Sequence, residues 1–298
     1  MNRRTITPFL IAAILSVSCA TGPKNFKKQL SGTLTEFGLF QQDALCYGYI
    51  KKTTGKEMWD SFLSDFHFNE NIKRFVIDKT NEIFYAVYKD EDRYSLSLLL
   101  RGKGYPALKI STALNFSSEW RKIKTKKAGA YWKSKTNNSA IAVRSNALLI
   151  LFGNIPDDCE YAKMPPDFEE FQKNAAAAGW MPSDSLLNNT LREFNVPLKL
   201  PMQNMSFAVF RRERGFETIF KIDAPNESQA KLIASIFTIM RNNKDSMSSL
   251  LADYFLANPA QITGKSVIIT TAPMSAEHAT GLMNLFLLES GIGLYAEK

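Results

Sequence analysis

The chain has 298 residues, of which 45% are hydrophobic, and this is enough for two domains that each have a core. Its formal net charge is +8; without the first 18 residues, 35 basic and 29 acidic side chains leave +6. Such a balance favours anionic lipid surfaces or acidic partners, and it is too small to predict a nucleic-acid-binding protein.

The N-terminus is predicted to be a secretory signal peptide over residues 1–18. Two arginines, Arg3 and Arg4, precede a short apolar run from Phe9 to Leu15. This run is shorter than the roughly 20 apolar residues that a membrane-spanning helix needs. The sequence therefore predicts that the chain is exported.

Small residues lead up to Cys19, and the arrangement resembles the lipobox of bacterial lipoproteins, although Ser16 stands where leucine is usual. In lipoproteins the cysteine is acylated and becomes the mature N-terminus, so Cys19 is the predicted lipidation site and residues 19–43 are the predicted tether. Spirochaete lipoproteins have similarly loose boxes. By analogy with such lipoproteins, Ala20 after the cysteine, in place of Asp, permits sorting to the outer membrane. The alternative is an ordinary signal peptide that contains a cysteine.

Two similar segments, 83–100 and 205–222, each predict a β-hairpin, because apolar and polar residues alternate along both. A helix and a second strand pair are expected after each hairpin. The predicted fold class is therefore α+β, with two tandem duplicated domains of the β-β-α-β-β type. These domains are placed at 44–156 and 202–298.

Glycines follow the first hairpin in the segment RGKGYPA, Arg101 to Ala107. The spacing imitates a dinucleotide-binding turn, but such a turn needs a parallel β-α-β unit, and the strand here is predicted to be half of a hairpin. We interpret the segment as a connector to a helix. The apolar residues of that helix are Leu108, Ile110, Leu114 and Phe116.

A basic segment interleaved with aromatic residues comes after this helix. Contact with anionic lipid headgroups is the functional interpretation, and a charged edge strand that blocks aggregation is the structural one. Export argues against nucleic acid as a partner. The candidate headgroup contacts are Arg121, Lys122, Lys124, Lys126 and Lys127.

Prolines divide a helical linker, 157–201, into two predicted amphipathic helices, 165–179 and 183–195, and a third is predicted at 246–257. Each apolar stripe either packs on a sheet, lines a ligand cavity or enters a membrane surface. The apolar C-terminal stretch 279–288 is expected to be buried. The candidate membrane or ligand contacts are Phe168, Phe171, Trp180, Leu187, Leu191, Met247, Leu250, Leu251, Tyr254 and Phe255.

Residues with catalytic or metal-binding chemistry are sparse. The chain has two histidines and no Cys/His cluster with metal-ligand spacing, so we predict no enzymatic activity, cofactor or metal. Cys46 and Cys159 either pair in an oxidising periplasm or remain two buried thiols.

The layout of Cys19 and the helices at 165–179, 183–195 and 246–257 resembles a treponemal (spirochaete) outer-membrane lipoprotein family. The resemblance implies a periplasm-facing, lipid-anchored protein that inserts amphipathic helices into a membrane leaflet and binds or carries lipid. Membrane lipids are then the expected partners. The alternative function is a non-catalytic module for interaction with envelope proteins, or a scaffold.

Overall fold

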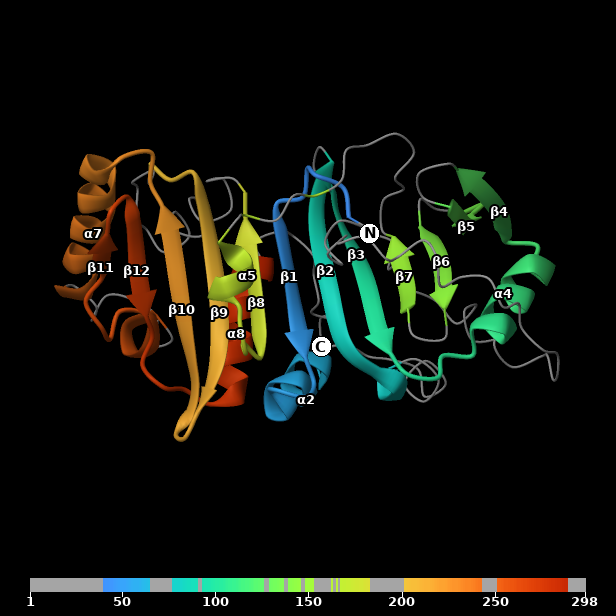
Figure 1. Ribbon diagram of the computed structural model, residues 1–298, viewed down its shortest axis with the longest axis horizontal. Helices are drawn as coiled ribbons and strands as arrows, with labels where there is room; N and C mark the ends of the chain where they lie inside the picture. Colours follow the sequence, from blue (N-terminus) through green and yellow to red (C-terminus); the bar gives the residue numbers. More distant parts are fainter. Residues whose placement is uncertain are drawn as a thin grey trace. The chain divides into compact units, whose positions relative to one another are not determined.

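The computed structural model of the chain has an α+β fold, as predicted (Figure 1). It falls into two compact units, whose described residues lie within 40–42, 77–85 and 96–162 for unit 1, and 43–64, 86–95 and 165–288 for unit 2. The structure describes residues 40–64, 77–90, 93–125, 129–136, 139–145, 148–152, 162, 165, 167–182, 201–242 and 251–288.

The two units interleave along the chain, whereas the sequence suggested the contiguous ranges 44–156 and 202–298. Residues 43–64 belong to the unit that also holds 165–288. The chain changes from one unit to the other within the strands of the first hairpin, β2 (Thr80–Asp90) and β3 (Arg93–Gly102). Each of these strands contributes residues to both units.

Unit 2 is built on antiparallel strands in the order β11-β12-β10-β9-β8-β1. Helix α7 lies against β11 and β12, and α8 contacts α2 and β10 (Figure 1). The strands are β1 (Cys46–Lys51), β8 (Ala177–Met181), β9 (Asn204–Arg212), β10 (Gly215–Asp223), β11 (Gln261–Thr263) and β12 (Ser266–Thr270). The helices are α2 (Lys56–Ser64), α5 (Phe168–Phe171), α7 (Glu227–Asn242), the short π-helical η4 (Leu251–Phe255) and α8 (Ala276–Leu288).

Unit 1 has antiparallel strands in the order β3-β7-β6-β5-β4, and helix α4 packs on β4 and β6. Strand β4 pairs only with β5 and forms an edge of the sheet. Besides β3, the elements are the 3-10 turn η2 (Ile77–Lys79), α4 (Ala107–Phe116), β4 (Trp120–Thr125), β5 (Gly129–Ser134), β6 (Ala140–Ser145) and β7 (Leu148–Phe152).

Both predicted hairpins are confirmed, as β2–β3 and β9–β10. The second pairs along its whole length, from Gly215 opposite Arg212 to Asp223 opposite Asn204. Every second residue of β10 is buried, which is the expected pattern for a strand with one face on the core. Gly215 closes the turn with φ of 129°, and a Cβ there would lie 2.3 Å from the carbonyl oxygen of Met274. Only glycine fits this position.

The predicted helix at 165–179 is wrong beyond residue 171. Helix α5 ends at Phe171, Asn174 has a left-handed φ of 64°, and Ala177–Met181 form β8. The prediction of a purely helical linker over 157–201 therefore fails in its middle, where a fully buried strand lies between β1 and β9.

The sheet, and not the local propensity of the alanines, decides the conformation of β8. A Cβ at Gly179 would lie 2.4 Å from the carbonyl oxygen of Tyr47 and 2.8 Å from the ring of Phe207. Small side chains are needed here because the neighbouring aromatic residues fill the available space. Tertiary packing thus overrides the high helix propensity of an alanine run.

The other predicted helices have different outcomes. The apolar C-terminal stretch lies in helix α8, and of its described side chains Ala279, Leu282 and Met283 are buried, as expected. Of the predicted helix at 246–257, the described part contains only η4. The predicted helix at 183–195 lies outside the described residues. Within the part of the chain that the structure describes, no helix is long and apolar enough to cross a membrane.

Candidate functional site

The aromatic residues of the predicted linker form a cluster in the core of unit 2. Trp180 on β8 stacks on its cross-strand partner Tyr47, with ring centroids 4.6 Å apart. Phe168 meets Trp180 edge-on at 4.9 Å, and Phe171 lies 6.4 Å from Phe168 at a half-buried position. Because Phe168 is 1% and Trp180 2% exposed, these two candidate lipid contacts are core residues in this structure.

A second aromatic cluster surrounds the η4 segment. Phe255 is 3% exposed and packs edge-on against Phe220 at 5.0 Å and Phe237 at 5.6 Å. Tyr254 is half-buried beside His278, with ring centroids 5.0 Å apart. Phe255 thus fixes η4 to β10 and α7. Leu251 is the first residue of η4, and the candidates Leu187, Leu191, Met247 and Leu250 lie outside the described residues.

The basic segment forms the edge strand β4 of unit 1. Arg121, Lys122 and Lys124 are all exposed, and Lys126 and Lys127 lie outside the described residues. The ammonium of Lys122 lies 5.0 Å from the ring centroid of Trp132, within the range of a cation–π interaction. The structure therefore brings together three of the five predicted headgroup contacts on one strand.

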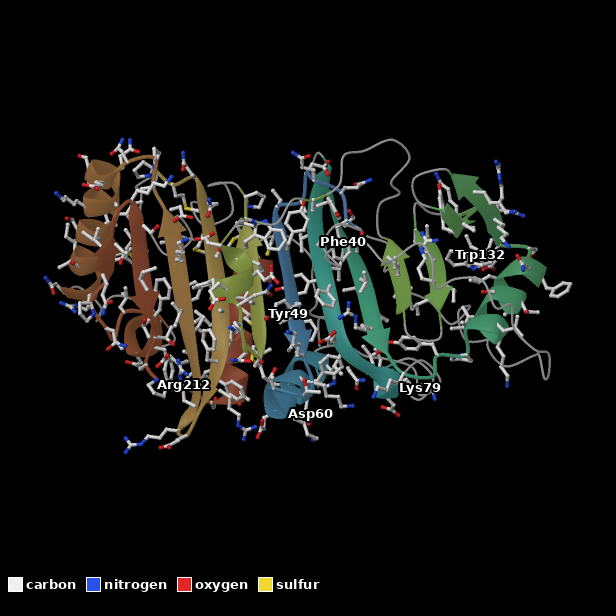
Figure 2. All side chains as sticks on the ribbon, in the orientation of Figure 1. Phe40, Tyr49, Asp60, Lys79, Trp132 and Arg212 are labelled. Atoms are coloured by element: carbon white, nitrogen blue, oxygen red, sulfur yellow. The ribbon has the colours of Figure 1, made fainter. Side chains whose placement is uncertain are left out.

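Trp132 links this strand pair to helix α4. Trp132 is labelled in Figure 2. It is 4% exposed, and its indole Nε1–H donates to Oδ1 of Asn115 at 3.0 Å. Sequence reasoning missed the exposed end of α4: Phe116 is 84% exposed, while Ile110 and Leu114 are buried. The helical period could have found this, because positions 110 and 114 share a face that position 116 does not.

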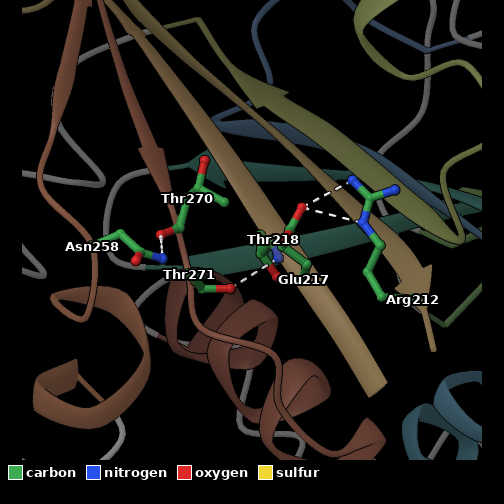
Figure 3. A network of polar contacts seen from close by, with 6 residues as sticks. All are labelled: Arg212, Glu217, Thr218, Asn258, Thr270 and Thr271. Carbon is green, nitrogen blue, oxygen red and sulfur yellow. Dashed lines mark hydrogen bonds and ion pairs between the residues drawn. The ribbon is translucent and has the colours of Figure 1, made fainter. Parts of the chain in front are cut away.

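Polar contacts near the β9–β10 turn are structural. Glu217 accepts from Arg212 at 2.9 and 3.3 Å, and the backbone N–H of Thr218 donates to Oγ1 of Thr271 at 2.9 Å (Figure 3). Asn258 donates to the carbonyl oxygen of Thr270 at 2.8 Å. The contacts tie β10 to the segment after β12, and the Glu217 carboxylate is engaged by an arginine.

The glycine-rich segment is a connector, as predicted. A Cβ at Gly102 would lie 1.9 Å from the carbonyl oxygen of Lys79, so the chain passes η2 without room for a side chain. The hydroxyls of Tyr105 and Thr80 are 2.8 Å apart. Burial raises the pKa of Tyr105 to about 12, although the hydrogen bond to Thr80 opposes the shift. The tyrosine is therefore a neutral packing residue.

Cys46 is a free thiol in the core of unit 2. Burial raises its pKa to about 12, so the reactive thiolate is not formed at neutral pH. Cys159 lies outside the described residues. Among the described residues, no group of histidine, cysteine or acidic side chains could hold a metal ion.

The fold and these sites define an α+β protein whose main features are two buried aromatic clusters and a basic edge strand. Residues 31–163 match the family model of the outer membrane-associated lipoprotein TP0453. The predicted resemblance to a treponemal outer-membrane lipoprotein is thereby confirmed. The match also supports the predicted lipid-anchored localisation in a bacterial cell envelope.

Solved structures of TP0453, a Treponema protein, share the fold of the chain. Crystal form I has a TM-score of 0.55 at 16% identity, and the alignment covers 86% of this chain and 98% of that chain. Crystal form III has a TM-score of 0.52 at 16% identity, with 83% and 96% covered. At this identity the likeness establishes the fold alone. No curated protein sequence matches the chain.

Proposed function

We propose that the chain is a periplasm-facing lipoprotein, anchored by acylated Cys19, that binds or carries membrane lipid. The observation that carries the proposal is the match of residues 31–163 to an outer membrane-associated lipoprotein family. The signal-like N-terminus ending at Cys19 agrees with it. Several acyl chains on the cysteine would make membrane attachment durable, because each buried CH2 contributes about 0.8 kcal/mol.

The lipid contacts in this proposal are the candidate residues other than Phe168, Trp180 and Phe255. Phe168, Trp180 and Phe255 are buried among aromatic neighbours, so their entry into a bilayer would first cost that packing. The proposal therefore relies on the remaining amphipathic candidates, which are Phe171, Leu187, Leu191, Met247, Leu250, Leu251 and Tyr254.

The proposal includes an internal duplication of the fold. In both halves, the second strand of the hairpin pairs antiparallel with the last strand after the helix, β3 with β7 and β10 with β12. Leu98 stands opposite Leu151, and Phe220 stands opposite Ile269. A shift of 122 residues takes Leu98 to Phe220, and a shift of 118 takes Leu151 to Ile269. The same registers in both halves support duplication.

An envelope interaction module is the second candidate. It predicts that the apolar stripes are packed, and the burial of Phe168 and Phe255 favours it. The apolar side chains of Leu232, Ile239 and Ile262, which are exposed on α7 and β11, would then contact a protein partner.

Native mass spectrometry of the detergent-extracted full chain, together with transfer of a fluorescent phospholipid between vesicles, tests the proposal. The account predicts co-purified phospholipid and transfer above the protein-free rate. The test variant is Leu187→Asp, Leu191→Asp, which changes two proposed lipid contacts and should transfer less phospholipid than the wild type. A chain that carries no lipid and moves none, but cross-links to a defined envelope protein, would establish the interaction module instead.

A further inference from the structure

The end of helix α4 exposes a large aromatic side chain. Phe116 is 84% exposed, the highest value among the exposed large hydrophobic residues of the described chain. Leu108, in the first turn of the same helix, is 38% exposed. Single exposed apolar residues are common on protein surfaces, so the exposure carries meaning only together with what surrounds it.

Positive charge is concentrated around this helix. Residues 107–136 contain eight lysines and arginines and a single acidic residue, Glu119, which gives the segment a net charge of +7. The whole chain has a net charge of +8. The segment that follows the second hairpin, 227–265, contains four basic and three acidic residues, a net charge of +1. The net charge of this one segment is therefore nearly as large as the net charge of the whole chain.

Hydrogen bonds hold the aromatic and basic residues in place. The turn after Phe116 is fixed by the ammonium of Lys135, which donates to the carbonyl oxygen of Ser118 at 2.6 Å. The backbone N–H of Lys135 donates to the carbonyl oxygen of Glu119 at 2.9 Å. Together with the Trp132–Asn115 bond, these contacts attach the C-terminal end of α4 to the β4–β5 pair. These hydrogen bonds therefore fix the position of the helix end from which the Phe116 side chain projects.

The lysines share the side of the strand pair that carries α4. Lys122 stands opposite Trp132, whose indole bonds to α4, and Lys124, two residues further along the strand, points to the same face. On the other face, Arg121 stands opposite Lys133. Arg121 and Lys133 therefore point away from the side of the strand pair that carries α4.

We propose that the α4–β4 face, defined by Phe116, Lys122, Lys124 and Lys135, docks on an anionic lipid bilayer. Phe116 enters the boundary between headgroups and acyl chains, and the basic side chains lie among the phosphates. This division of roles is typical of interfacial protein segments, and each basic residue near an anionic surface contributes to binding. The proposal rests on the proposed membrane function and names the surface that performs it.

Vesicle co-sedimentation of the mature chain with Cys19→Ser tests the α4–β4 face. The probes are vesicles of phosphatidylcholine alone and of phosphatidylcholine mixed with phosphatidylglycerol. The wild-type face should bind the anionic vesicles more tightly, and added salt should weaken binding. Replacement of Lys122 and Lys124 by Gln should weaken binding about fivefold for each charge. Phe116→Ser should weaken it about tenfold.

The matched control is Ile239→Ser on α7, which removes an apolar side chain that is 61% exposed but lies outside the basic segment. It should bind within about twofold of the wild type, and all variants should keep the wild-type Tm, because the altered side chains are on the surface. Equal weakening by Phe116→Ser and Ile239→Ser, or no preference for anionic vesicles, would overturn the docking surface. Acylation of Cys19 and membrane attachment, measured on the full chain, would be unaffected by that result.

Discussion

Helices α4 and α7 follow the two hairpins, and they bury corresponding residues but present different surfaces. A shift of 123 residues takes Ile110 to Ile233 and Leu114 to Phe237, all of which are buried. The same shift takes Phe116 to Ile239, and both are exposed. The charge around the helices differs, with +7 for residues 107–136 and +1 for residues 227–265.

This comparison shows that packing restricts the buried positions of the two helices, whereas their exposed positions can differ. The buried positions must fill the space between helix and sheet, and changes of even one methylene there are felt. The exposed positions have no such restriction. The segment around one helix can therefore be strongly basic while the segment around the other is nearly neutral. The corresponding pattern inside and the contrast outside are what a duplicated fold with one specialised copy would show.

The largest effect is expected from adding a side chain at one closely packed glycine in each unit. Gly102→Ala in unit 1 and Gly179→Ala in unit 2 would each place a Cβ within 2.4 Å of a carbonyl oxygen. Each should lower the free energy of unfolding by about 3 kcal/mol or more, because the clash is with backbone. Urea unfolding measures the loss. The control is Gly264→Ala, where nothing lies within 4 Å and only the positive φ of 58° is strained; its loss should be about 1 kcal/mol.

Truncation of the corresponding buried residues should be the next largest effect. Leu114→Ala should cost about 2–5 kcal/mol and Phe237→Ala about 3–5 kcal/mol. The exposed pair, Phe116→Ala and Ile239→Ala, should change stability by less than about 0.5 kcal/mol. Urea unfolding of the four variants measures the contrast. A large loss from either exposed position would break the correspondence between the helices.

The smallest effect is expected at an ion pair of unit 2. Lys221 donates to Asp167, and this hydrogen bond holds the pKa of Asp167 below its usual value of 3.8. A carboxyl with a lowered folded-state pKa stabilises the fold above about pH 4, and this contribution is lost as the pH falls through the folded-state pKa. Asp167→Asn should therefore lower Tm at pH 6 by a small amount and leave it unchanged at pH 2. A deficit of the same size at both pH values would contradict this assignment.

Local pattern was sufficient to predict several parts of the fold. Alternating residues identified both hairpins, and β10 buries every second side chain as its sequence indicates. The helices after the two hairpins were also predictable from their apolar positions. In each of these elements, the residues that define the structure lie close together in sequence.

Strand β8 could not be predicted in this way. Its alanines favour a helix when considered alone, and the strand exists because Trp180 pairs with Tyr47, which lies more than 100 residues earlier in the chain. The basic strand could be predicted from composition, and the helical period separates the exposed Phe116 from the buried Ile110 and Leu114. A single sequence does not show which strands pair when they are far apart in the chain, as β8 and β1 are.

Acylation and membrane attachment of the full chain, measured in the cell that makes it, test the central claim most directly. Cells are labelled with palmitate and fractionated, and the N-terminal peptide is identified by mass spectrometry. The account predicts that the chain is in the membrane fraction with acyl groups on Cys19, and that Cys19→Ser loses both the label and durable attachment. An unmodified chain in the soluble fraction would contradict the account.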